Sequence, residues 1–216
     1  MVIKRLQRHL LLCGAFSSAV YILMNIVTVI MYKGYSVSDQ TVSELSAIGA
    51  PTRRLWVLLS LVYSLSLALF GWSIRQLYKK DRRLALVGSL FLLNAVIGLF
   101  WPPMHQREVL AAGGKTFSDA LHIVFTVVTV LIMVVAIVFS VPAFGRVFRI
   151  YSLVTLLILL CAGIATGMDA PKIQANESTP WIGIWERVNI GVYMAWVIVF
   201  SILMWHRTAS QAFSRH

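Results

Sequence analysis

Ionisable side chains stand at helical spacing inside several long apolar runs of this sequence. Asp119 and His122 are three positions apart near the start of one run, so a helix would carry both on one face. A carboxylate beside an imidazole can orient a general base or a metal ligand. Two structural alternatives stay open: Asp119 follows Thr116 where the helix dipole favours an acid, and His122 could simply hydrogen-bond between helices. The pair is our candidate for acid–base catalysis.

Further polar residues in or beside the apolar runs are candidates for ligand binding. Glu186 and Arg187 are adjacent, so they point about 100° apart on a helix and do not form only a mutual salt bridge. Arg187 could clamp a phosphate or carboxylate group, or form a buried ion pair with Asp119 or Glu44. The candidate ligand-binding residues are Asn25, Ser43, Glu44, Asp169, Glu186, Arg187 and Asn189.

The spacing of possible metal ligands does not predict a metal site. The two cysteines stand in separate apolar runs, without the C-x-x-C spacing typical of such sites. Asp119 and His122 supply two ligands, and the sequence does not show which third residue would join them. We therefore expect no tightly bound metal, and no motif identifies a cofactor.

The composition indicates the environment of these residues. Of 216 residues, 59% are hydrophobic and only 12% are charged, whereas a soluble domain has roughly 25% charged residues. Lipid tails can face an apolar surface that water cannot. The net charge of +11 arises from basic residues between apolar runs, a pattern typical of topology-determining charge and contact with anionic lipid. We therefore expect membrane lipids, and not nucleic acid, as partners.

Six apolar segments are long enough to cross a bilayer, which takes about 20 residues. The first is too long for a signal peptide, whose apolar part has about 7–15 residues, so we interpret it as a retained span. The predicted fold is all-α: a polytopic bundle of about six transmembrane helices forming one membrane domain over residues 1–216. The predicted spans are residues 10–32, 55–77, 84–101, 118–141, 150–168 and 184–205.

The distribution of Lys and Arg predicts the orientation. The termini and the second and fourth loops together hold 12 of these residues, against 7 on the opposite side. This places both termini in the cytoplasm and, for a bacterial cell, the protein in the inner membrane. Only one of the eight acids, Asp81, lies on the cytoplasmic side. The candidate site residues therefore gather at the extracytoplasmic end of the bundle.

The first outer loop contains a predicted short helix. Thr41 and Glu44 fit a capping box, and Val42, Leu45 and Ile48 repeat at three-residue spacing before a Gly-x-Pro stop. We expect an amphipathic helix that lies on, or folds into, the outer mouth of the bundle, with Leu45 buried. This places Ser43 and Glu44 near the outer ends of the spans.

Three segments together resemble a known family. They are Thr41-Val-Ser-Glu-Leu-Ser-Ala-Ile-Gly-Ala-Pro, Asp119-Ala-Leu-His122 and Gly183-Ile-Trp-Glu-Arg187. They are similar to the prokaryotic membrane family catalogued as domain of unknown function 998, whose members have about six spans, an I-S-E-L-G-like outer loop, a His in the fourth span and a Glu/Gln-Arg pair before the last. Trp101-Pro-Pro-Met-His105 departs from the Phe-Pro-acid pattern of the family. The resemblance implies a shared architecture and outer polar cluster, and no particular reaction.

The sequence thus predicts the location of the functional residues, at the extracytoplasmic end of the bundle, more clearly than it predicts the function itself. Our interpretation is a multi-pass membrane protein whose extracytoplasmic polar cluster binds or processes a lipid-like or small anionic ligand. One alternative is a transporter or channel, which would need a polar path through the mostly apolar inner half. Another is a structural or assembly protein, with the cluster holding helices together. Whether the protein is an enzyme, and its oligomeric state, stay open.

Overall fold

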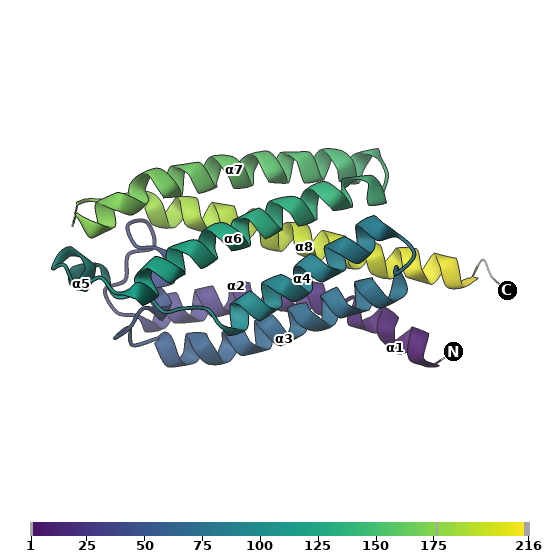
Figure 1. Cartoon of the computed structure of the whole chain (residues 1–216), viewed down its shortest axis with the longest axis horizontal. Helices are drawn as coiled ribbons and strands as arrows, with labels where there is room; N and C mark the ends of the chain where they lie inside the picture. Colours follow the sequence, from purple (N-terminus) through teal and green to yellow (C-terminus); the bar gives the residue numbers. More distant parts are fainter. Residues whose placement is uncertain (1, 176, 214–216) are drawn as a thin grey trace.

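The computed structural model describes residues 2–175 and 177–213, which fold as a bundle of helices (Figure 1). Six helical segments are long and apolar enough to cross a membrane, which confirms the predicted all-α bundle. The elements are α1 (Val2–Leu10), α2 (Cys13–Met31), η1 (Val42–Ser46), α3 (Arg53–Leu77), α4 (Arg82–Leu99), α5 (Arg107–Ala111), α6 (Phe117–Ser140), η2 (Val141–Ala143), α7 (Arg146–Gln174) and α8 (Ile182–Phe213).

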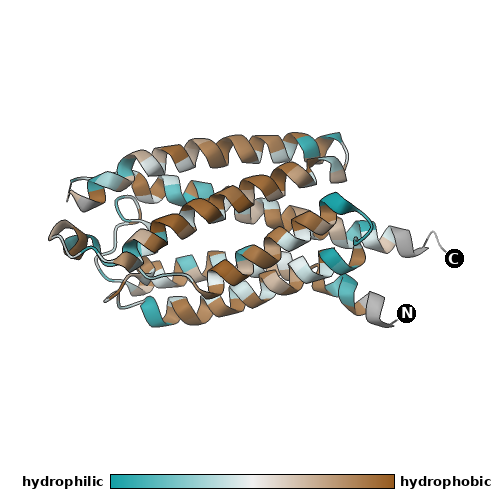
Figure 2. Ribbon diagram, in the orientation of Figure 1, coloured by the Kyte–Doolittle hydropathy of each residue, from teal (hydrophilic) through white to brown (hydrophobic). Residues whose placement is uncertain are grey.

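The bundle has two chemically different ends. Figure 1 shows both termini at one end, which we call the terminus end; it also carries the turns at residues 78–81 and 141–145. The opposite end, called the loop end, carries residues 32–52, 100–116 and 177–181. Hydrophobic residues fill the middle of the helices, while hydrophilic residues gather toward both ends (Figure 2). This banding is the pattern that a hydrocarbon layer with two polar interfaces requires.

Several helices differ in extent from the predicted spans. Helix α7 has 29 residues and α8 has 32, because helix continues through polar flanks beyond the apolar run. The first predicted span is interrupted between α1 and α2. The Ser201 hydroxyl of α8 donates to the Leu11 carbonyl (2.6 Å) and accepts from the Ala15 N–H (3.1 Å). In a continuous helix these two backbone groups would bond to each other, so Ser201 breaks the ladder by insertion.

An aromatic cluster, here called the aromatic layer, fills the bundle core toward the terminus end. Phe200 lies at its centre, with the centroids of the other five rings 5.0–6.3 Å away. The rings come from α3, α4, α7 and α8 and from the residue after η2, and they pack against one another in the core. Its members are Phe70, Phe91, Phe144, Phe148, Trp196 and Phe200.

The predicted helix of the first loop is present as the 3₁₀ helix η1. Its capping box between Thr41 and Glu44 is formed, and Leu45 is fully buried, so η1 folds into the mouth of the bundle. The inclusion of Ile48 in this helix is wrong. The backbone becomes extended at Ala47, and the Ile48 N–H then donates to the Met104 carbonyl (2.7 Å), tying the first loop to the segment after α4.

Candidate functional site

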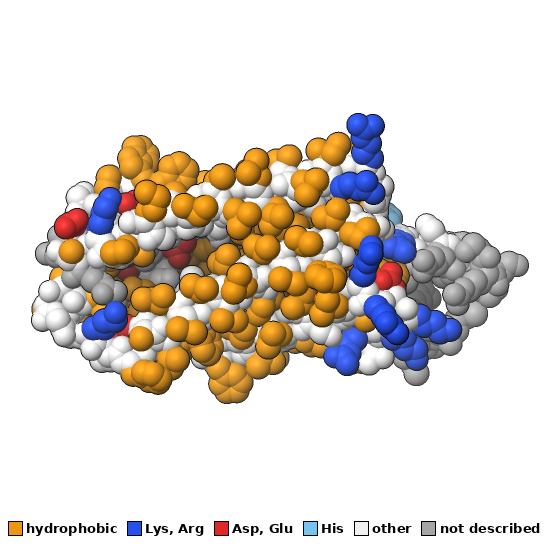
Figure 3. Space-filling model, turned by 45° about the horizontal axis from the view of Figure 1, so that its top comes forward, with side chains coloured by type: hydrophobic (Ala, Val, Ile, Leu, Met, Phe, Trp, Pro, Cys, Tyr) orange, Lys and Arg blue, Asp and Glu red, His pale blue; other side chains and the backbone are white. Residues whose placement is uncertain are grey.

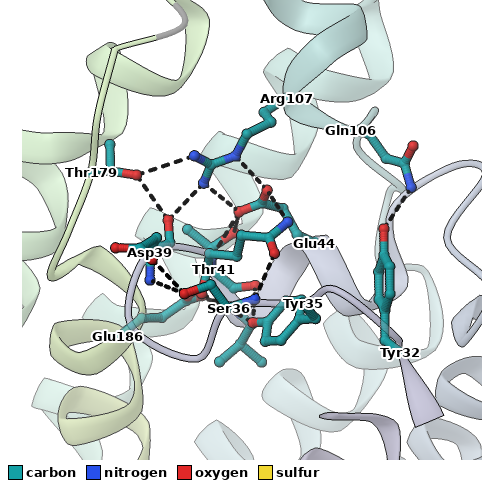
Figure 4. Close-up of polar contacts among 12 residues, drawn as sticks. Tyr32, Tyr35, Ser36, Asp39, Thr41, Glu44, Gln106, Arg107, Thr179 and Glu186 are labelled. Atoms are coloured by element: carbon teal, nitrogen blue, oxygen red, sulfur yellow. Dashed lines mark hydrogen bonds and ion pairs between the residues drawn. The ribbon is translucent and has the colours of Figure 1, made fainter. Parts of the chain in front are cut away.

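A buried ion pair organises the loop end (Figure 4). The Arg107 guanidinium, on the first residue of α5, contacts the Glu44 carboxylate through Nε–Oε1 (2.8 Å) and Nη2–Oε2 (3.0 Å). It also donates to the Asp39 carbonyl (2.8 Å) and the Thr179 hydroxyl (3.3 Å). The hydrogen bonds with Glu44 raise the pKa of Arg107 above its ordinary value. The bidentate contact joins the first two loops of the loop end, and the hydrogen bond to Thr179 adds a third loop that is far away in the sequence.

Glu44 has little capacity left for a ligand. Its Oε2 accepts from the Thr41 N–H (2.7 Å) and hydroxyl (3.0 Å), and its Oε1 accepts from Gln40 (3.2 Å). With Arg107 these donors surround a carboxylate that is only 2% exposed. A buried charge needs such compensation, so this arrangement supports a framework role for Glu44.

Arg187 binds the first loop to α8. It donates to the carbonyls of Val37 (2.9 Å), Gln40 (3.3 Å) and Gly183 (3.0 Å), and to the Tyr35 hydroxyl (2.7 Å). Gly183 permits this approach, since an added Cβ would lie 2.3 Å from the Val37 and Gln40 carbonyl oxygens. Burial raises the pKa of Tyr35 to about 12, although the adjacent guanidinium acts in the opposite direction. Among the described contacts, Arg187 holds main-chain and hydroxyl oxygens and forms neither predicted ion pair.

Asp119 caps α6. Its carboxylate accepts from the Thr116 N–H (2.8 Å) and hydroxyl (2.8 Å), and from the His105 N–H (2.6 Å); His105 Nδ1 lies 3.0 Å away. Asp119 therefore pairs with His105, and no described hydrogen bond joins it to His122. The capping-box geometry matches the structural alternative that the sequence left open.

His122 pairs with Ser43 instead. Its Nε2 lies 3.0 Å from the Ser43 hydroxyl, and its Nδ1 lies 2.8 Å from the Pro102 carbonyl and 3.2 Å from Trp101 Nε1. The Pro102 carbonyl can only accept, whereas the Trp101 indole N–H can only donate. With a proton on Nδ1, His122 donates to Pro102 and its Nε2 accepts from the Ser43 hydroxyl; without that proton, Nδ1 accepts from Trp101 and Nε2 donates to Ser43. The Trp101 ring packs edge-on against the imidazole at 5.3 Å, which fixes its orientation.

Glu186 completes a row of three polar groups. Its carboxylate accepts from the Val42 N–H (2.6 Å). Glu186 therefore contacts η1 at the residue before Ser43, whose hydroxyl contacts His122. Ser43 and Glu186 are only partly buried, and the space-filling view shows a hollow near the loop end with acidic atoms at its floor (Figure 3). We call Ser43, His122 and Glu186 the polar row.

Six of the eight buried side chains that have a polar atom without a hydrogen-bond partner among the described residues form a group inside the bundle; the other two are Arg8 and Trp205. On α4, Asn94 comes one turn after Phe91 of the aromatic layer; on α8, Tyr193 comes one turn before Trp196. Given the direction of each helix, both lie on the loop side of that layer. Buried polar groups normally find a partner. The residues of this polar layer are Ser18, Asn25, Ser64, Asn94, Thr129 and Tyr193.

Two sequence candidates lie elsewhere. The Asn189 amide donates to the Leu159 carbonyl (2.6 Å) and so ties α8 to α7. Asp169 forms an i,i+3 ion pair with Lys172 (2.6 Å) on α7. The structure brings neither into contact with the polar row. Within residues 2–175 and 177–213, no three His, Cys, Asp or Glu side chains group as metal ligands.

Sequence reasoning missed the contribution of residues 101–107. None of Trp101, Pro102 and Arg107 was among the candidate site residues. The only local signal was the unusual Trp101-Pro-Pro-Met-His105 segment. Its role depends on a long-range approach to η1 that no local pattern encodes.

Residues 15–203 match the family described as "Protein of unknown function (DUF998)". The chain belongs to the DUF998 family. This match confirms the resemblance carried by the three short segments. The matched range includes every residue of the polar row and of the polar layer. No curated protein and no solved structure matches the chain.

Proposed function

We propose that this DUF998 protein binds the polar head of a membrane amphiphile in the loop-end hollow. The observation that carries the proposal is the polar row: the Ser43 hydroxyl contacts the buried His122, Glu186 accepts from the backbone N–H of the adjacent Val42, and Ser43 and Glu186 are partly exposed. Unpartnered polar atoms of the polar layer lie beneath it. Polar groups inside a membrane bundle are costly and commonly mark a functional interior.

The accessible groups favour a head that donates hydrogen bonds. Glu186 offers carboxylate oxygens, whereas the guanidinium groups of Arg107 and Arg187 are directed at internal acceptors. An anionic ligand would meet the Glu186 carboxylate, while these two guanidinium groups stay engaged with their described internal acceptors. We therefore propose a hydroxyl-rich or amine-bearing head in place of the anionic ligand considered from the sequence.

The aromatic layer argues for a closed chamber and against a conducting path. Phe70, Phe91 and Phe200 are fully or almost fully buried across the bundle on the terminus side of the polar layer. A transported polar solute would have to pass these packed rings. This supports binding from the loop end over the transporter alternative.

A second candidate function, hydrolysis or acyl transfer, is favoured by one contact. With a proton on Nδ1, His122 presents Nε2 to the Ser43 hydroxyl at 3.0 Å, the relation of a base to a nucleophile oriented by a third group. A fluorophosphonate probe should then label wild type and not Ser43→Ala. Absence of labelling in folded wild-type protein would contradict the hydrolysis or acyl-transfer candidate and would leave ligand binding as the proposed function.

Lipid retention tests the binding proposal. The protein is extracted in mild detergent, and bound amphiphiles are measured by native mass spectrometry and solvent extraction. Glu186→Gln keeps the side-chain shape but removes the charge. We expect retention to fall about ten-fold or more, the range for losing a hydrogen bond to a charged group. Glu177→Gln, an exposed acid at the same end, is the matched control and should retain the amphiphile.

Two results would contradict this proposal. One is a wild-type protein that retains no amphiphile in a gentle extraction. The other is equal loss in Glu186→Gln and Glu177→Gln. If Ser43→Ala and Glu186→Gln only lower the melting temperature, the polar row holds helices together, as the structural alternative states.

We also propose that both termini face the cytoplasm, in a bacterial cell at the inner membrane, as the Lys and Arg distribution supports. The native cysteines are first replaced in Cys13→Ala and Cys161→Ala. Single cysteines at Lys79 and Glu108 are then tested with a membrane-impermeant maleimide on intact cells. Position 108 should react and position 79 should not. The reverse pattern would invert the topology.

A further inference from the structure

A basic groove lies at the terminus end, between the end of α3 and the start of α4. It has a volume of about 400 Å³. Three of its six lining side chains are cationic and, in this fully described set, none is acidic. Figure 3 shows basic side chains gathered at this end of the molecule. The groove is lined by Arg75, Lys79, Arg82, Ala85, Leu86 and Ser89.

The nearby acid does not neutralise the groove. The Asp81 carboxylate accepts from the Arg83 and Leu84 N–H groups (3.1 and 3.2 Å) as the N-cap of α4. It lines a separate pocket on the other side of that helix start. None of the three ion pairs found among the described residues includes a groove cation. Three like charges are therefore held together without a described carboxylate partner.

The walls of the groove are rigidly placed. Helices α3 and α4 cross at Gly71 and Gly88, where an added Cβ on Gly71 would lie 2.6 Å from the Gly88 carbonyl oxygen. One turn along, Arg75 Nη1 donates to the Ser89 hydroxyl (3.1 Å) across the same pair of helices. This bond orients the guanidinium before any ligand arrives, which lowers the entropic cost of binding.

The groove borders the lipid-facing surface. Leu86, in its lining, is 38% exposed, and Trp72, one turn before Arg75, is 39% exposed. A ligand with a phosphate at the cations could therefore lay an apolar chain along α4. Free phosphate would use only the charged half of this surface.

We propose that the groove is a binding site for an anionic phospholipid, with the phosphate held by Arg75, Lys79 and Arg82. Arg and Lys are the side chains best suited to phosphate oxygens, and Leu86 receives the acyl chain. This site lies at the opposite end of the bundle from the polar row and does not depend on the function proposed there.

Lipid competition in nanodiscs tests the assignment. Wild type is reconstituted with mixtures of phosphatidylglycerol and phosphatidylcholine, and bound lipid is counted by native mass spectrometry. The variant Arg75→Gln/Arg82→Gln is compared with Arg146→Gln/Arg149→Gln, which removes the same charge from exposed positions at the same end. Losing hydrogen bonds between a guanidinium and phosphate oxygens weakens binding about ten-fold or more. We therefore expect phosphatidylglycerol retention to fall about ten-fold or more in the groove variant and to change much less in the control, which removes only surface charge.

A third variant tests the remaining cation of the groove. Lys79 lies in the turn between α3 and α4, so Lys79→Gln should weaken phosphatidylglycerol retention about five-fold without affecting folding. Equal losses in the groove and control variants would show general surface attraction and overturn the site. Displacement of the lipid by millimolar inorganic phosphate, or equal retention of phosphatidylcholine, would overturn the assignment to an anionic lipid.

Discussion

Two polar regions meet in η1 at the loop end, and they differ in how their groups are satisfied. Glu44 is 2% exposed and surrounded by donors from Thr41, Gln40 and Arg107. Its neighbour Ser43 is partly exposed and its hydroxyl contacts His122. Two adjacent residues of one short helix thus belong to different regions. Glu44 belongs to the framework, the buried cluster around its ion pair with Arg107, and Ser43 belongs to the polar row. Residue type and depth are similar in the two regions, and they differ in the number of described hydrogen-bond partners.

The largest expected effect is on the framework side of this comparison. Glu44→Ala leaves the Arg107 guanidinium buried without its carboxylate, which costs about 3–5 kcal/mol. The measurement is chemical or thermal unfolding in detergent. Lys172→Ala breaks an exposed ion pair and should not change stability measurably. Equal effects of the two substitutions would mean that Glu44 is not a framework residue.

The next effect tests whether η1 is fixed in the mouth of the bundle. Leu45 is fully buried, so Leu45→Ala should destabilise by about 3 kcal/mol through lost burial and a cavity. Ile48→Ala, two residues beyond η1 and 37% exposed, should change stability by about 0.5 kcal/mol or less. Unchanged stability of Leu45→Ala would show that η1 is not fixed in the bundle. The described contacts of both Glu44 and Ser43 would then be contradicted.

A smaller expected effect is a pH dependence of the free energy of unfolding, caused by Tyr35 at its contact with Arg187. Burial raises the pKa of Tyr35 to about 12, against about 10 in an unfolded chain. Between these values the unfolded chain has lost a proton that the folded protein keeps, so stability falls as pH rises from about 10 to 12. We expect a loss of about 1–2 kcal/mol, discounted for partial exposure. The comparison is unfolding of wild type and Tyr35→Phe over this range; parallel curves would contradict the assignment.

The smallest stability effect is expected in the polar row. Ser43→Ala removes one neutral hydroxyl, which costs about 1 kcal/mol or less, while amphiphile retention should fall. The measurement pairs a melting curve with lipid extraction on the same sample. A loss of stability as large as that of Glu44→Ala, with retention unchanged, would place Ser43 in the framework and erase the distinction between the two regions.

The sequence by itself determined the class of fold and several local features. Hydropathy over about 20 residues is a local property, so the six spans were predictable from composition along the chain. Capping boxes are local too: the Thr41–Glu44 motif spans four residues and forms as predicted. Thr116 and Asp119 have the same spacing, and the structural alternative for Asp119 was recognisable for that reason.

Only the tertiary structure decided which polar groups meet. Arg107 lies 63 positions from Glu44, and His122 lies 79 positions from Ser43; such contacts depend on how loops fold over packed helices. Asn189 shows the same limit, since it shares the helix of Glu186 yet turns toward α7. Successive residues rotate about 100° around a helix, and the neighbours that meet each direction are set by packing. The transmembrane spans can therefore be predicted from the sequence, whereas the contacts of the polar residues at the ends of the spans depend on how the helices and loops pack.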